Sequence, residues 1–172
     1  MSRYPHLFEP IAIDGLEIRN RVMLCPMCLG YAEKDGGVND RVVAYFAARA
    51  RGGVGLVLTG YTFVDDKMSR SGPTQMGVYS DHLIPGLRRL AQAVQKEGAK
   101  IFLQLVHGGR QADVALFGER RVAPSSVGTD VIPAPTELTV EQIEEIIEAF
   151  GKAARRAREA GFDGVEAHGA HG

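Results

Sequence analysis

Two histidines near the end of the sequence are the side chains best suited to chemistry. His168 and His171 stand three residues apart with only glycine and alanine between them, directly after the short apolar run Gly164–Ala167. A lone histidine in such a place is more often solvated or structural than functional. A close pair can converge on one ligand, donate hydrogen bonds to a carbonyl or nitro oxygen, and stabilise negative charge that develops there.

Cys25 and Cys28 form a Cys-x-x-Cys pair and are the only cysteines in the sequence. One interpretation is a thioredoxin-like redox pair, which would need a helix that starts at the motif, whereas a glycine-rich loop follows here. A second is half of a zinc site that His168 and His171 complete. A third is that Cys25 packs in the core and Cys28 lines a pocket. The pattern is compatible with all three.

Two further residues of interest lie at or near the ends of predicted strands. Gly60 follows the apolar run Gly55–Thr59, either as a simple turn residue or because a flat ligand approaches the backbone too closely for a side chain. Gln104 lies near the end of the run Lys100–Leu105, and its amide offers both a donor and an acceptor to a heterocycle. The next segment, His107–Gly109, is similar to an esterase oxyanion loop, but the sequence has no Gly-x-Ser-x-Gly motif.

The elements that carry these residues follow one repeated pattern, in which a helix ends in glycine and a short apolar strand follows. Gly52, Gly98 and Gly161 mark the helix ends, since glycine accepts the left-handed conformation of a helix cap. Strands that alternate with helices pair in parallel through right-handed crossovers, and continuous apolar runs are typical of a parallel sheet. The strand ends and the long connections 60–81 and 106–138 then meet at one rim.

Local signals predict the individual elements. The pair Asp14-Gly15 favours a tight β-hairpin between the flanking apolar residues. Asn39 can cap a helix that runs to about residue 51, and Thr139 with Gln142 forms a capping box at the start of the last helix. The predicted apolar stripe of that helix consists of Ile143, Ile146, Ile147, Phe150, Ala154 and Ala157.

Composition places the sequence among ordinary globular proteins. Hydrophobic residues make up 45% and charged residues 24% of its 172 residues, and the formal net charge is -1. This net charge does not indicate the basic surface that nucleic-acid binding requires. No apolar run reaches the roughly 18 residues of a membrane helix. The first residues lack the apolar region of a signal peptide, so we expect a cytoplasmic protein without nucleic-acid or membrane partners.

Taken together, the motifs resemble the Old Yellow Enzyme family of NADH:flavin oxidoreductases, which contains ene-reductases and 2,4-dienoyl-CoA reductase-like enzymes. The matching segments stand in the family's order, and they are Leu7–Pro10, Asn20–Val22, Ala47–Ala50, Gly53–Leu56, Gln104–Arg110, Ala123–Ser126 and His168–Gly172. The resemblance implies an α/β fold, a TIM (β/α)8 barrel. Residues 1–172 would be the N-terminal half of this single FMN-binding domain, with an N-terminal β-hairpin and only the first four strands.

The resemblance also implies a role for each candidate residue. The residues implied to contact FMN are Pro26, Met27, Cys28, Gly60 and Gln104, with the glutamine at the pyrimidine part of the ring. His168 and His171 would be the catalytic pair that holds the electron-withdrawing oxygen of the substrate. Tyr31 is a candidate substrate contact, because Gly30 stands where many members have a tyrosine.

The implied reaction is the NAD(P)H-driven reduction of an activated alkene, such as an enone or an enoyl or dienoyl thioester, through FMN. The family's usual proton donor is a tyrosine directly after the His-x-x-His-Gly motif, where this sequence stops at Gly172. The loops that hold a phosphate follow strands 7 and 8 of such a barrel. We therefore expect the isolated chain to retain FMN weakly, and to self-associate or to need a complementary C-terminal half.

Two other functions are alternatives. One is a zinc-binding module that uses the Cys25/Cys28 and His168/His171 pairs. The other is a non-catalytic interaction fragment, whose open sheet edges bind a partner. Flavin absorbance and metal analysis distinguish these alternatives from a flavoprotein.

Overall fold

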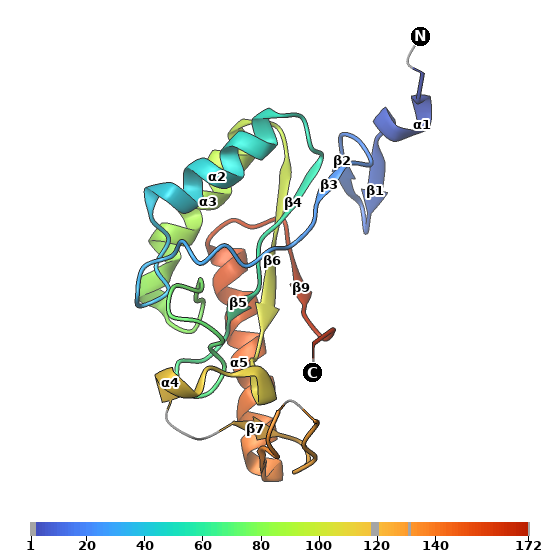
Figure 1. Cartoon of the computed structure of the whole chain (residues 1–172). Helices are drawn as coiled ribbons and strands as arrows, with labels where there is room; N and C mark the ends of the chain where they lie inside the picture. Colours follow the sequence, from blue (N-terminus) through green and yellow to red (C-terminus); the bar gives the residue numbers. More distant parts are fainter. Residues whose placement is uncertain (1–2, 118–120, 131, 172) are drawn as a thin grey trace.

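A parallel β-sheet with helices on one face organises the chain, and the computed structural model describes residues 3–117, 121–130 and 132–171 (Figure 1). In this sheet β3 (Met23–Leu24) pairs with β4 (Leu56–Leu58), β4 pairs with β6 (Lys100–Val106), and β6 pairs with β9 (Gly164–Ala167), always in parallel. Strands β4 and β9 fall within the predicted apolar runs, and β6 extends one residue beyond its predicted run. The predicted α/β fold with a parallel sheet is therefore confirmed.

The strand that begins with β4 is interrupted close to its end. Both β4 and β5 (Thr62–Phe63) pair with β6, on the edge that β9 does not occupy. Leu58 and Thr62 are four positions apart, but their partners Phe102 and Leu105 are three positions apart. One extra residue therefore lies in the segment Thr59–Tyr61, and such an insertion redirects the side chains that follow it.

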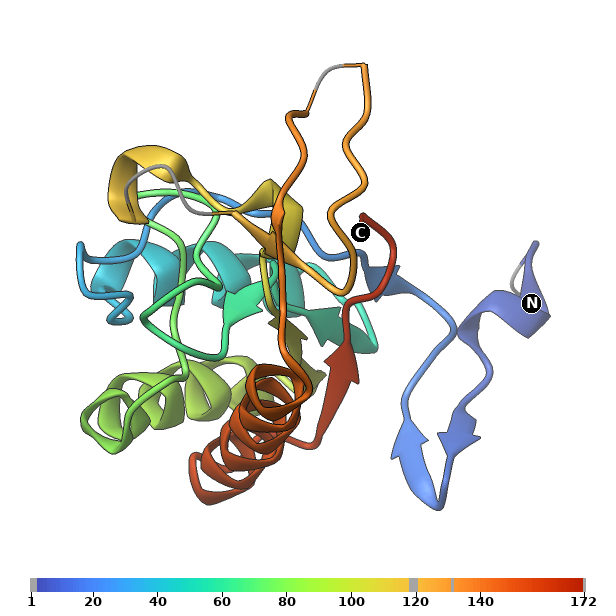
Figure 2. The same ribbon diagram turned by 90° about the horizontal axis from the view of Figure 1, so that it is seen from below.

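Three helices pack against the sheet (Figures 1 and 2): α2 (Asp40–Arg51), α3 (Ile84–Lys96) and α5 (Val140–Glu159). The side chain of Asn39 accepts a hydrogen bond from the Val42 N–H at 3.1 Å and caps α2. Thr139 and Gln142 form the predicted capping box of α5. Both cap predictions are confirmed, because each depends only on residues within one turn of the chain.

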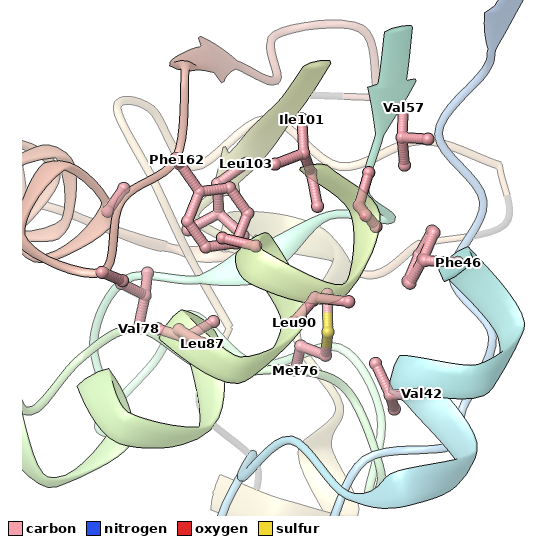
Figure 3. Packing of buried hydrophobic residues seen from close by; sticks show 14 of the residues in the cluster. Val42, Phe46, Val57, Met76, Val78, Leu87, Leu90, Ile101, Leu103 and Phe162 are labelled. Atoms are coloured by element: carbon pink, nitrogen blue, oxygen red, sulfur yellow. The ribbon is translucent and has the colours of Figure 1, made fainter. Parts of the chain in front are cut away.

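The core lies between these helices and one face of the sheet (Figure 3). Alternate residues of β6, among them Ile101 and Leu103, are fully buried there against Phe46 of α2 and Leu87 and Leu90 of α3. Burial of one such side chain stabilises the fold by about 1.5–3 kcal/mol. Because side chains alternate along a strand, the other residues of β6, including Gln104, point to the opposite face.

The predicted apolar stripe of α5 is only partly right. Ala157 is fully buried, and Phe150 packs partly against the core, as predicted. Ala153, which lies outside the predicted stripe, is also fully buried, while Ile147 is 65% exposed. The core therefore touches the second half of α5, while in its first half Ile143 and Ile146 are half-buried and Val140 and Ile147 are exposed.

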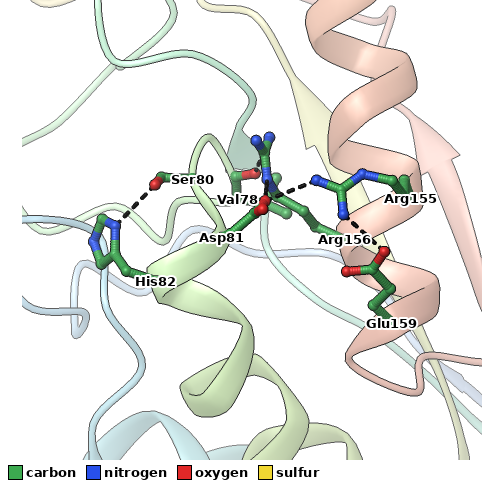
Figure 4. A network of polar contacts seen from close by, with 7 residues as sticks. All are labelled: Val78, Ser80, Asp81, His82, Arg155, Arg156 and Glu159. Atoms are coloured by element: carbon green, nitrogen blue, oxygen red, sulfur yellow. Dashed lines mark hydrogen bonds and ion pairs between the residues drawn. The ribbon is translucent and has the colours of Figure 1, made fainter.

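An ion-pair cluster joins the start of α3 to α5 (Figure 4). Asp81, in the short helix η1 (Asp81–Leu83), accepts hydrogen bonds from Arg155 and Arg156 at 2.7 and 2.6 Å. Arg156 also donates to the Val78 carbonyl at 3.2 Å. The two guanidinium groups hold the pKa of Asp81 below its usual range, with Arg156 the larger cause.

The N-terminal segment stands beside the sheet rather than in it (Figures 1 and 2). After α1 (Pro5–Phe8), β1 (Ile11–Ile13) and β2 (Leu16–Ile18) form the predicted hairpin, in which Asp14 and Gly15 have φ angles of 48° and 80°. The hairpin prediction is confirmed, since Asp-Gly suits a turn with two positive φ angles.

The remaining elements belong to the connection after β6. They are η2 (Gly109–Gln111), α4 (Val114–Phe117), β7 (Val122–Ala123) and β8 (Thr136–Glu137), and β7 pairs with β8 in parallel. Within the described ranges, no helix is both long enough and apolar enough to cross a membrane.

Candidate functional site

His168 and His171 face each other just beyond β9. The Nε2 atom of His168 lies 2.7 Å from the Nδ1 atom of His171. A hydrogen bond between two ring nitrogens needs one N–H and one lone pair, so the pair shares a proton across this contact. The backbone N–H of His168 donates to the Leu105 carbonyl at 2.8 Å, which extends the ladder between β6 and β9 and fixes the position of the pair.

Tyr61 connects the histidine pair with the Cys-x-x-Cys segment. Its ring stacks on that of His168, with centroids 5.9 Å apart and an angle of 19° between the planes. Burial raises the pKa of Tyr61 to about 12, and its hydrogen bond with Cys28 adds to the shift. The phenol is therefore neutral at physiological pH. Sequence reasoning missed this residue, although its place directly after Gly60 at a strand end was a usable signal.

A cavity of about 400 Å³ opens beside the histidine pair. Its lining consists of Tyr61, Ser71, Val106, His107, Gly108, Gln111, His168, Gly169 and His171. This volume suits a small organic ligand, and the lining combines apolar surface with a few polar groups that can orient one. The structure thus brings both predicted histidines to a single cavity at the rim of the sheet.

The predicted cofactor residues Pro26, Met27 and Cys28 follow β3 and lie beside Gly60. A Cβ atom at Gly60 would stand 2.1 Å from the Met27 carbonyl oxygen, so close packing of two backbone segments already requires glycine there. A ligand is therefore not needed to explain Gly60. Met27 is 52% exposed, and Cys25 and Cys28 are both exposed, so the interpretation that Cys25 packs in the core is wrong.

Tyr31 lies away from the histidine pair. It lines a second, smaller cavity together with Met27, Cys28 and Tyr61. The guanidinium carbon of Arg41 lies 3.8 Å from the centre of the Tyr31 ring, which is within the range of a cation–π interaction. Only Tyr61 lines both cavities, so among the described tyrosines it, rather than Tyr31, joins the cysteine to the histidines.

Gln104 is 2% exposed and points to the face of the sheet opposite the helices. Its Nε2 atom donates to a carboxylate oxygen of Glu166 at 3.0 Å. Its backbone N–H donates to the hydroxyl of Thr59 at 3.2 Å, at the interruption between β4 and β5. Both the backbone and the amide of this residue are therefore held in place.

His107 and Asp65 form a partly buried pair beside the cavity. The Nδ1 atom of His107 accepts a hydrogen bond from the Gly109 N–H at 3.1 Å, so the ring proton lies on Nε2. This Nε2 is 3.2 Å from an Asp65 carboxylate oxygen, but its N–H is poorly aligned for a hydrogen bond. Burial alone would raise the pKa of Asp65, and His107 with the Lys67 and Met68 N–H groups outweighs burial and lowers it.

The cysteine and histidine pairs do not form a metal centre. Among residues 3–117, 121–130 and 132–171, no three histidine, cysteine, aspartate or glutamate side chains are grouped so that they could hold a metal ion. The zinc alternative therefore has no support in the described part of the chain, since a zinc site needs at least three such ligands.

The sequence of this chain matches that of a known protein family. The sequence profile of the NADH:flavin oxidoreductase / NADH oxidase family matches residues 6–172. A metal reductase of Desulforamulus reducens is 48% identical over 161 residues, which are 93% of this chain and 24% of that protein. An NADPH dehydrogenase of Geobacillus sp. is 42% identical over 168 residues, which are 96% of this chain and 48% of that protein. The chain thus spans half or less of the length of these relatives.

Solved structures agree with the sequence comparison. The old yellow enzyme homologue from Zymomonas mobilis superposes on 95% of this chain with a TM-score of 0.86 and 30% identity, and the match covers 48% of that structure. A 2-naphthoyl-CoA reductase superposes on 95% of the chain with a TM-score of 0.90 and 29% identity, and the match covers 27% of that structure. The expectation from the sequence motifs is confirmed, and the chain belongs to the NADH:flavin oxidoreductase / NADH oxidase family.

Proposed function

We propose that this chain forms the site of an FMN-dependent oxidoreductase that uses NAD(P)H to reduce activated C=C bonds. The observation that carries the proposal is the His168–His171 pair, held 2.7 Å apart at the wall of a cavity at the strand ends. The names of two relatives, each of which includes a compound with a C=C bond, support the choice of substrate. These relatives are a cinnamate reductase of Clostridium sporogenes and an NADH:acrylate oxidoreductase of Vibrio harveyi, 39% and 41% identical to this chain.

The residues at the rim suit FMN. Met27 and Cys28 expose their side chains next to Gly60, and together they offer a surface for a flat ring. Gln104 adds an amide, a side-chain group that can donate to and accept from a heterocycle at once. We propose that these residues and Pro26 hold the isoalloxazine ring. The chemistry that bound FMN supplies is hydride transfer.

The histidine pair would bind and polarise the substrate. A neutral pair retains one outward N–H, because each neutral ring carries one hydrogen and one of the two is used between the rings. Donation of this N–H to the carbonyl or carboxylate oxygen of an activated alkene draws electron density away from the double bond. The same hydrogen bond strengthens as negative charge develops on that oxygen, which stabilises the transition state more than the bound substrate.

We also propose that residues 1–172 are the N-terminal half of a (β/α)8 barrel and supply its first four strands. Coverage of 48% of the NADPH dehydrogenase and of the old yellow enzyme homologue supports this proposal. Exposed apolar side chains on the two outer strands support it as well, because Met23 of β3 is 45% exposed and Val165 of β9 is 41% exposed. The partner would be a complementary C-terminal half or a second copy, and the proposed location is the cytoplasm, where NAD(P)H is available.

The test uses the complete product of the gene that encodes this sequence. The purified protein should be yellow, release FMN on denaturation, lose its visible absorbance when NADH or NADPH is added without oxygen, and regain it when cinnamate or acrylate follows. A protein that binds no flavin would overturn the proposal. Residues 1–172 alone should bind FMN at least tenfold more weakly, because phosphate sites in such barrels follow strands 7 and 8, and tight stoichiometric binding would contradict the half-barrel assignment.

A further inference from the structure

Gln104 and Glu166 are direct cross-strand partners. The register of β6 and β9 sets the two residues opposite each other, and the amide nitrogen of Gln104 lies 3.0 Å from a carboxylate oxygen of Glu166. Cross-strand neighbours on one face of a sheet are close enough for such a contact without any change in the backbone. His168 follows Glu166 by two positions, so Gln104 and Glu166 lie at the same end of the strands as the two histidines.

The chemistry of the contact fixes the orientation of the amide. An ionised carboxylate only accepts hydrogen bonds, so the NH2 group of Gln104, and not its carbonyl oxygen, must face Glu166. The opposite orientation would place two acceptors 3.0 Å apart. The backbone of Gln104 is held independently, because its N–H donates to the hydroxyl of Thr59. Neither a flip of the amide nor a shift of the strand is open to this residue.

The amide still has one acceptor and one donor to offer. Its carbonyl oxygen receives no hydrogen bond from any residue in the described part of the chain, and the second hydrogen of its NH2 group is likewise unused. This oxygen is not among the fully buried polar atoms without a partner in the described part of the chain, so it remains open to a ligand or to water. The pyrimidine part of a flavin presents an N–H donor at N3 directly beside a carbonyl acceptor, which is the complement of this amide.

We propose that Glu166 is a positioning residue for flavin recognition, which rests on the function proposed above. It holds the Gln104 amide so that the carbonyl oxygen accepts from the N3–H of the ring and the free N–H donates to the neighbouring ring carbonyl. Without the carboxylate, Gln104 can turn over and present its NH2 group to the N3–H, where two donors would meet. Glu166 therefore selects the orientation in which Gln104 and the ring are complementary.

The first arm of the test is independent of flavin. The side-chain NH2 signals of Gln104 are identified in nitrogen-resolved NMR spectra of the flavin-free complete gene product as those that vanish in Gln104→Leu. In the wild-type protein one of the two hydrogens should exchange with water at least about tenfold more slowly than those of exposed glutamines, because it is buried and bonded to a carboxylate. Glu166→Gln, which is nearly the same size, should change the shift of this signal and speed its exchange.

The matched control is Glu145→Gln, an exposed glutamate of α5 that contacts neither residue. It should leave the Gln104 signals unchanged, and the thermal transition of each variant verifies that it folds. Gln104 signals that are the same in wild type and Glu166→Gln would overturn the inference and leave the proposed function untouched. Should Glu166→Gln not fold, rapid exchange of both Gln104 hydrogens in the wild-type gene product would overturn the inference equally well.

The second arm uses FMN with the complete gene product. The alkaline ionisation of the flavin N3–H is followed by absorbance, and acceptance by Gln104 should move it to higher pH than in free FMN. In Glu166→Gln the pH at which the N3–H ionises should move back toward that of free FMN by about one unit, a tenfold change. Glu145→Gln should match the wild type. Equal ionisation in wild type and Glu166→Gln overturns the inference. Absence of bound flavin overturns the proposed function instead, and the NMR arm still decides whether Glu166 holds the amide.

Discussion

The Nε2 atom of His168 and the Nδ1 atom of His171 lie 2.7 Å apart, so the two rings act as one hydrogen-bonding unit. Rotation of either ring would break the hydrogen bond between them. This contact, together with the stacking of Tyr61 on His168, gives two histidines on a glycine-rich segment a defined orientation. It also means that removal of one ring alters the hydrogen bonding of the other.

The first prediction concerns this shared proton. His171→Ala should change the nitrogen NMR shifts of the His168 ring, because its Nε2 atom loses its partner and turns to solvent. His107 provides the internal control, since its Nδ1 atom accepts from the Gly109 N–H and its tautomer does not depend on His171. Identical His168 spectra in the wild type and in His171→Ala would show that the pair does not exist in solution.

The second prediction uses the raised pKa of Tyr61, which is about 12 in the folded protein because of burial and the bond with Cys28. An unfolded tyrosine ionises near pH 10, so the unfolded state loses its proton first. The free energy of unfolding should therefore fall as pH rises from about 10 to about 12, and it should fall less in Tyr61→Phe. Urea titrations across this range measure it, with Tyr31→Phe as the control, and parallel curves for wild type and Tyr61→Phe would contradict the assignment.

The third prediction separates two glycines. Gly60→Ala should destabilise the protein by about 1–3 kcal/mol or more, because overpacking displaces neighbouring backbone and the new Cβ would meet the Met27 carbonyl oxygen at 2.1 Å. Gly151→Ala, inside α5 with no atom within 4 Å of the new Cβ, should stabilise it by about 0.5–1 kcal/mol. Urea unfolding of both variants is the measurement. Equal stability of the two would refute the close approach of the Gly60 and Met27 segments.

The fourth prediction concerns Asp81, whose pKa is lowered chiefly by Arg156 and then by Arg155. A carboxyl with a lowered folded pKa adds stability above its unfolded pKa of roughly 3.9, and this contribution disappears as pH falls through the folded value. Asp81→Asn should therefore be less stable than the wild type at pH 7 and approach it in acid. Thermal unfolding from pH 7 to pH 2 tests the trend, and Asp130→Asn, at an exposed position, should follow the wild type throughout.

Local features of the sequence predicted most of the elements, because each depends on neighbours along the chain. The Asp14-Gly15 turn and the Thr139 capping box are examples, and the structure contains both. The exposure of Ile147 in α5 could not be predicted from such local features. Ile147 matches the helical period of the stripe, but periodicity does not show how far along a helix its packing partners reach.

Residue types and strand ends identified candidate residues, but not the contacts that these residues make. His168, His171 and Gln104 were identified from residue type and their position at strand ends. The bond between Gln104 and Glu166 depends on the register of two strands that lie 62 residues apart in sequence. Tyr61 was missed although it follows Gly60 at a strand end, but the extra residue between β4 and β5 beside it is visible only when the pairing with β6 is known.

The most direct test of the proposed function is the anaerobic rate at which cinnamate or acrylate reoxidises the NADH-reduced flavin of the complete protein. The wild type should be reoxidised by the alkene, and His168→Ala and His171→Ala should each slow this step by about 10²–10³-fold, the usual effect of removing one hydrogen bond to a developing oxyanion. His82→Ala, on an exposed residue bonded to Ser80 outside the cavity, should leave the rate unchanged. Reoxidation by the alkene at the wild-type rate in both variants of the pair, or none in the wild type, would contradict the proposed role of these histidines.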